Sequence, residues 1–169
     1  TWLCVTLLSV LYFIYCSEMW NQLDALTGLL NQNSYLNRTA EMRRSGEVLF
    51  VFDVDDFKQV NDRYGHVKGD ICLAEIAACI KKAYARHGYC YRMGGDEFCV
   101  LLRDGDWEHA CARDFVRRLD ERRKELDFLP TVSFGSAEIS SENVVTVKDR
   151  ADHNMYRYKK ERKAHRMSG

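Results

Sequence analysis

One segment of the sequence constrains the fold more than any other, because it favours a single local structure. Two strand-like runs, residues 89–93 and 98–102, are separated by only four residues. The first two of these are Gly94 and Gly95, and glycine accepts the positive φ angles that tight hairpin turns need. The segment therefore predicts a β-hairpin, in which the two strands pair antiparallel.

The rest of the chain supplies further strands and helices around this hairpin. Residues 48–54 form a compact run of β-branched and aromatic side chains, which is typical of a buried strand, and residues 131–139 form another. Apolar spacing and helix-ending residues predict helices at about 34–45, 57–64, 69–87, 106–126 and 147–163. This order predicts an α+β fold with a mainly antiparallel central sheet of about five strands, flanked by helices.

Length and composition favour one globular domain. The chain has 169 residues, of which 46% are apolar, and it carries 25 basic and 25 acidic side chains. This size suits a single domain, and the balanced charge argues against a disordered chain and a dedicated nucleic-acid binder. Five cysteines of the predicted domain lack the spacing of metal ligands, so we expect core thiols in a reducing compartment.

The N-terminal segment differs from the rest because residues 1–17 carry no charge. A membrane span needs about 17–25 mostly apolar residues. The chain also begins without Met, so we interpret residues 1–17 as the end of a transmembrane helix. Residues 18–30 are expected to form a stalk helix and turn, and residues 31–169 the folded domain. A signal peptide, or a core or coiled-coil helix, is the alternative.

Acidic residues gather where two predicted strands end. Asp53 and Asp55 project from the same side of the strand at 48–54, because side chains alternate along a strand. The hairpin turn adds Asp96 and Glu97. Carboxylates this close repel one another unless a cation joins them, and oxygen ligands suit Mg²⁺ bound together with substrate phosphates. The pattern indicates a magnesium and phosphate site, with an ordinary acidic turn as the alternative.

Several segments together resemble the GGDEF domain of diguanylate cyclases. They are DALTGLLN at 24–31, FDVDDFKQVND at 52–62, GHVKGD at 65–70, RMGGDEF at 92–98, SFGSA at 133–137 and ADHNMY at 151–156. The resemblance covers about residues 22–163, in the order of the family's motifs. It implies condensation of two GTP into cyclic di-GMP with release of two pyrophosphates. It also implies a nucleotidyl-cyclase-like sheet with a ferredoxin-like core.

The resemblance implies roles for the acidic cluster. Asp53, the backbone carbonyl of Val54 and Asp96 would hold Mg²⁺, with Mn²⁺ as the alternative metal. Glu97 would be a further ligand or the group that assists deprotonation of the 3′-hydroxyl. The sequence leaves that base role open between Asp96 and Glu97. Lys58 would stabilise phosphate charge in the transition state.

The resemblance also implies a guanine pocket. Asn61 and Asp70 would read the base edge, and His66 would line the same pocket. A carboxylate can accept hydrogen bonds from both N1–H and the exocyclic amine of guanine. Adenine lacks both donors there, so Asp70 is the predicted specificity residue.

Phosphate binding is expected at the glycine pair, at Lys159 and at Lys163. Gly94 and Gly95 would let a phosphate approach the backbone closely, and Lys159 would reach the β- and γ-phosphates. Two positions depart from the family pattern: Gln32 and Lys163 stand where Arg is common. Lys supplies charge without the bidentate fork of Arg, so Lys163 would hold phosphate less firmly.

A product-inhibition site is not expected. Many relatives carry an Arg-x-x-Asp motif before the turn at residues 94–97, which we call the signature turn. Ala85 and Gly88 stand at the Arg and Asp positions of that motif. Neither residue can form the required hydrogen bonds with product.

The interpretation also includes an assembly and a location. Each half-site would hold one GTP, so a homodimer is expected for catalysis. The N-terminal helix would tether the protein to the inner membrane with its catalytic domain in the cytoplasm. A silent GGDEF module that binds GTP or a partner protein, and synthesis of a different cyclic dinucleotide, are the alternative functions. The presence of Asp53, Asp96 and Glu97 argues against the silent module, and Asp70 argues against adenine.

Overall fold

A central antiparallel sheet organises the computed structural model, which describes residues 2–40, 46–140 and 143–167. The sheet contains β1 (Val48–Val54), β2 (Gly88–Gly94), β3 (Glu97–Leu102) and β4 (Val132–Glu138). Their order across the sheet is β2-β3-β1-β4, and every neighbouring pair is antiparallel. The described residues thus form four strands rather than the expected five or so, and the order is that of a ferredoxin-like core.

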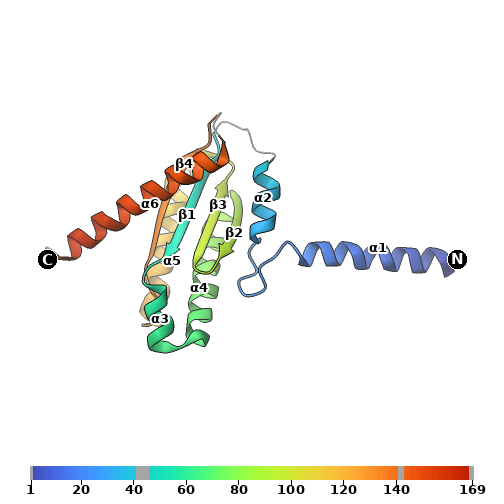
Figure 1. Ribbon diagram of the computed structural model, residues 1–169, viewed down its shortest axis with the longest axis horizontal. Helices are drawn as coiled ribbons and strands as arrows, with labels where there is room; N and C mark the ends of the chain where they lie inside the picture. The colour runs from blue at the N-terminus through green and yellow to red at the C-terminus, as the bar shows by residue number, and fades with distance from the viewer. Residues whose placement is uncertain (1, 41–45, 141–142, 168–169) are drawn as a thin grey trace.

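Helices cover both faces of this sheet (Figure 1). One core cluster joins the sheet to α3 (Phe57–Tyr64), α4 (His66–Tyr84) and α5 (Glu108–Glu125). The other cluster joins the opposite face to α2 (Gln32–Ala40) and α6 (Val144–Met167). The α+β class predicted from the sequence is confirmed.

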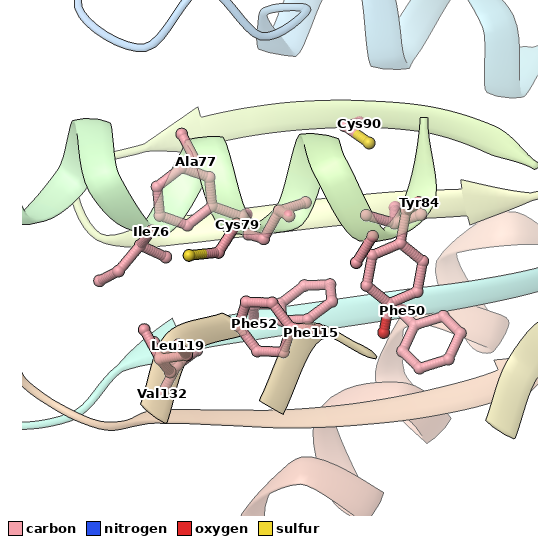
Figure 2. Close-up of a cluster of buried hydrophobic side chains, with 14 of the residues drawn as sticks. Phe50, Phe52, Ile76, Ala77, Cys79, Tyr84, Cys90, Phe115, Leu119 and Val132 are labelled. Carbon is pink, nitrogen blue, oxygen red and sulfur yellow. The ribbon is translucent and has the colours of Figure 1, made fainter. Parts of the chain in front are cut away.

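The sequence of β1 explains why the sheet is buried on both sides. Phe50 and Phe52 face the cluster under α4 and α5, whereas Leu49 and Val51 face the cluster under α2 and α6. Figure 2 shows the first of these layers, where Phe115 of α5 lies edge-on to Phe52 at 5.2 Å between ring centroids. A strand that is apolar on both faces has no solvent side, so it occupies the middle of the sheet.

The five cysteines of the domain lie within these layers. All five are buried free thiols: Cys72, Cys79, Cys90, Cys99 and Cys111. Burial raises the pKa of the Cys90 thiol to about 12. They are therefore inert core residues, as the sequence predicted.

The N-terminal helix α1 (Trp2–Trp20) projects away from the sheet (Figure 1). Its large apolar side chains are exposed, with Trp2 85% and Phe13 73% accessible. Within the described residues, none of the helices combines the length and apolar character needed to cross a membrane.

Two predicted element boundaries were wrong. The stalk helix, which we expected to continue to near Gly28, ends at Trp20, and a turn closed by a bridge between Leu23 and Leu30 follows it. Helix α4 begins at His66 rather than near Gly69, because Gly65 alone, at φ 84°, makes the joint between α3 and α4. The predicted end of the helix at 34–45 lies partly outside the described residues, since 41–45 are not among them.

Candidate active site

The signature turn lies against the end of β1, as the strand pattern predicted. Asp53 is directly opposite Glu97 in the register of β1 and β3. The backbone amide of Val54 donates to the carbonyl of Asp96 at 3.3 Å. Antiparallel pairing thus brings together residues more than forty positions apart, at the edge of the sheet where β1 ends and β3 begins.

A lysine from the last helix reaches this edge. The Nζ atom of Lys159 is 2.7 Å from Oδ2 of Asp53 and 3.2 Å from Oδ1 of Asp55. The three side chains are 25%, 27% and 12% exposed, respectively. Both carboxylates therefore project to the same side, as the sequence predicted. Lys159, expected to contact phosphate, is here their counter-ion.

Asp55 is held by two hydroxyl groups as well as by this lysine. Thr131 Oγ1 and Ser133 Oγ each donate to Asp55 at 2.7 Å. Burial alone would raise the pKa of Asp55, but these hydrogen bonds and Lys159 outweigh it, so its pKa is lowered. Burial would lower the pKa of Lys159, and its bonds to Asp53 and Asp55 raise it instead. Asp55 is thus a fixed anion that helps to orient Lys159.

An ion pair joins the signature turn to the turn that follows α1, at residues 21–31. Nη1 of Arg92 lies 3.0 Å from Oδ1 and 3.2 Å from Oδ2 of Asp24. Nε and Nη2 of the same arginine donate to the carbonyl of Gly95 at 3.2 and 2.8 Å. Thr27 donates to Asp24 from its amide and its hydroxyl group. This pair fixes the turn that carries Asp96.

The predicted nucleotide-binding residues lie on α3 and α4. Lys58, His66 and Asp70 are exposed, and Asn61 is half-buried at the last turn of α3. Asp70 follows Asn61 across the α3–α4 joint, so the two predicted guanine-reading residues come from different helices. The side chain of Lys163 falls outside the part of the chain that the structure describes.

The backbone explains one of the two residues at the positions of the inhibitory motif. Ala85 is the C-cap residue of α4, and Gly88 begins β2. A Cβ atom at Gly88 would lie 3.0 Å from Cα of Leu102 and closer still to the Leu101 carbonyl. A longer side chain at this position would therefore require the strand pair to move apart.

The fold and this arrangement of motifs define a family. A family model described as "Diguanylate cyclase, GGDEF domain" matches residues 21–165. The chain therefore belongs to the GGDEF family of diguanylate cyclase domains.

Individual relatives agree with this assignment. The chain is 32% identical to the diguanylate cyclase DgcN of Escherichia coli over 82% of its length, and 34% identical to DgcS of Shewanella oneidensis over 84%. It spans 37% of DgcN and 51% of DgcS. A crystal structure of the coiled coil and GGDEF domain of DgcB from Caulobacter crescentus in complex with c-di-GMP matches with a TM-score of 0.79 at 25% identity. That match covers 94% of this chain and 93% of the other.

Cyclases of this family generally use a divalent metal ion, and the residues at the sheet edge fit one. The donors are oxygen atoms only, and the structure already holds one cation, the ammonium group of Lys159, between Asp53 and Asp55. No group of three or more potential ligands that could hold a metal occurs among the described residues. Mg²⁺ does not require one, since it is usually bound by one or two carboxylates together with substrate phosphates.

Sequence reasoning missed two residues that shape this site. Thr131 and Ser133 were assigned only to a strand, whereas Asp55 was already part of the predicted acidic cluster. The sequence pattern that could have identified Thr131 and Ser133 is the alternation of polar side chains around the start of β4, which places both hydroxyl groups on one face.

Proposed function

We propose that the chain is a diguanylate cyclase, which condenses two GTP into cyclic di-GMP and releases two pyrophosphates. The observation that carries this proposal is the pairing of Asp53 with Glu97 across β1 and β3, with Lys159 in contact with Asp53. Two carboxylates and a lysine at a glycine turn form a site for a cation and a polyphosphate.

The residues of the chain would divide the work of binding and orientation. Asp53, the Val54 carbonyl, Asp96 and Glu97 would hold Mg²⁺ or Mn²⁺. Such an ion neutralises charge on the α-phosphate and the leaving pyrophosphate and favours the deprotonated 3′-hydroxyl. Lys58 lies one turn from the end of β1, and its ammonium group would offset the charge that develops on phosphate.

The substrate would extend from the sheet edge to the α3–α4 joint. The guanine would lie between Asn61 and Asp70, with His66 on the rim, and Gly94 and Gly95 would leave backbone room for the phosphates. Lys159 would exchange its contact with Asp53 for the β- and γ-phosphates. The ammonium group of Lys159 already lies beside Asp53, so it would have to move only a short way to reach phosphates bound there.

We propose that two copies act together, since each site holds one GTP and the product joins two. The exposed apolar surface of α1 supports both an anchoring role at the inner membrane and a stalk that pairs two copies. The coiled coil that precedes the GGDEF domain in the DgcB structure supports the stalk. A cytoplasmic location of the domain follows from its substrate.

A second candidate is a silent module that binds GTP or a partner protein without turnover. The contact of Lys159 with both Asp53 and Asp55 favours it, because the ammonium group already lies where the metal ion would bind. Product analysis separates the two functions. The full chain is incubated with Mg²⁺ and either GTP or ATP, and the products are identified by mass spectrometry. Cyclic di-GMP from GTP alone supports the proposal, whereas GTP binding without any product supports the silent module.

A further inference from the structure

Helix α4 contains one glycine, Gly69, at a position where the backbone does not require it. Its amide donates to the carbonyl of Gly65 at 3.1 Å, so it belongs to the first turn of the helix. Its φ angle lies in the ordinary range, unlike those of Gly65, Gly94 and Gly95. Glycine within a helix costs about 0.5–1 kcal/mol relative to alanine. Conformation alone therefore does not explain this residue.

The space beside Gly69 is occupied by a predicted guanine-reading residue. A Cβ atom at position 69 would lie 3.1 Å from Cγ of Asn61, and closer still to its Oδ1 atom. It would also lie 3.4 Å from Cζ of Phe57, which is an ordinary contact. The conflict is therefore with the carboxamide of Asn61.

The carboxamide fills the space that such a side chain would need. Its Oδ1 atom is buried, and it has no hydrogen-bond partner within the described residues. Gly69 is itself buried, and it is joined directly to the exposed Asp70. The missing side chain thus lets the end of α3 approach the start of α4, with the carboxamide of Asn61 against the backbone of Gly69.

We propose that Gly69 is a positioning residue for guanine recognition: its lack of a side chain leaves the space in which the carboxamide of Asn61 lies, next to the backbone that carries Asp70. The inference rests on the proposed function, because it deepens the same nucleotide site. A methyl group at this position would push Asn61 aside and leave the phosphate-binding residues in place. Base recognition would weaken while polyphosphate binding persisted.

A double-mutant cycle separates this role from simple helix packing. Binding of guanosine 5′-[α,β-methylene]triphosphate to the full chain is measured by calorimetry with Mg²⁺ for the wild type, Gly69→Ala, Asn61→Ala and the double variant. Tripolyphosphate serves as the ligand without a base. Val67→Ala is the matched control, since Val67 lies in the same turn of α4 and is 76% exposed.

We expect Gly69→Ala to weaken binding of the GTP analogue about three- to tenfold, the factor that a lost hydrogen bond between neutral groups represents. Asn61→Ala should weaken it as much, and the double variant should be no weaker than Asn61→Ala. Tripolyphosphate should bind all variants equally. Additive losses in the double variant, or wild-type affinity in Gly69→Ala, would overturn the inference.

The folding of the variants and the binding by the wild type are also decisive. If Gly69→Ala fails to fold, the double variant should fold, because it lacks the carboxamide. A double variant that also fails to fold would assign Gly69 to packing against Phe57 and overturn the proposal. A wild-type chain that binds tripolyphosphate but not the GTP analogue would reject the proposed function itself. Wild-type binding of the analogue that is unchanged in Gly69→Ala would reject only the role of Gly69.

Discussion

Replacing Lys159 by methionine tests the electrostatics of the sheet edge most sharply. Methionine keeps a long flexible side chain and removes the ammonium group that lies 2.7 Å from Asp53 and 3.2 Å from Asp55. The two carboxylates then lose the positive charge that Lys159 supplies. We expect Lys159→Met to destabilise the metal-free protein and to increase its response to Mg²⁺.

The magnitude follows from how far these groups are buried. Exposed ion pairs contribute about 0–1 kcal/mol, whereas removing one partner of a buried pair costs about 3–5 kcal/mol. The side chains of Lys159 and Asp53 are 25% and 27% exposed, and that of Asp55 is 12% exposed. An intermediate loss of about 2 kcal/mol is therefore expected, which lowers Tm by about 4–8 °C for a domain of this size.

Thermal unfolding in EDTA and then in Mg²⁺ measures both effects. The matched control is Lys148→Met, which removes an ordinary pair with Asp152 one turn away on the same helix. We expect it to cost less than about 0.5 kcal/mol and to leave the response to Mg²⁺ unchanged. A Lys159→Met variant as stable as the wild type in EDTA, or one that gains no extra stability from Mg²⁺, would refute the reasoning.

Three further predictions concern the turn, the base pocket and acid stability. Arg92→Lys keeps the charge but loses the fork that joins Asp24 to the turn, so unfolding experiments should show a loss of about 1–3 kcal/mol; an unchanged midpoint would contradict this. Asp70→Ser should reduce the preference for GTP over ATP about tenfold or more in a competition assay, and unchanged discrimination would place guanine recognition elsewhere. The lowered pKa of Asp55 stabilises the fold above its ordinary pKa near 4, and this contribution is lost as the pH falls further. Denaturation of Asp55→Asn should therefore depend less on pH below about 4 than that of the wild type, and parallel curves would rule out this assignment.

The inhibitory motif gives one more expectation, since Ala85 and Gly88 cannot bind product there. Calorimetric titration of cyclic di-GMP into protein occupied by a non-hydrolysable GTP analogue should detect no tight binding. Binding of a product dimer under these conditions would reveal an inhibitory site built from other residues.

Much of the sheet could be predicted from the sequence because its signals are local. The run at 48–54 is apolar on both faces, and a short glycine turn separates 89–93 from 98–102, so strand positions and antiparallel pairing follow directly. The resemblance then placed Asp53 and Glu97 at one site, and the strand register brings them together. Their catalytic roles remain predictions.

The errors arise where tertiary contacts override local signals. Gly69 looked like a helix boundary, yet it lies inside α4, and its contact with Asn61 gives a reason for a glycine there. The segment at 18–30 looked helical, but Asp24 bonds to Thr27 and Arg92, and these bonds favour a turn. The contact of Lys159 with Asp53 joins residues 106 positions apart, which no local pattern can reveal.

The central claim is that the carboxylates of the signature turn carry metal-dependent synthesis of cyclic di-GMP. The most direct measurement compares the rate of cyclic di-GMP formation from GTP and Mg²⁺ by the wild type and by Glu97→Ala. Glu97 is exposed at the hairpin tip, so the variant should fold with an unchanged Tm in EDTA. We predict product from the wild type and none from Glu97→Ala, whereas a near wild-type rate in the variant would contradict the account.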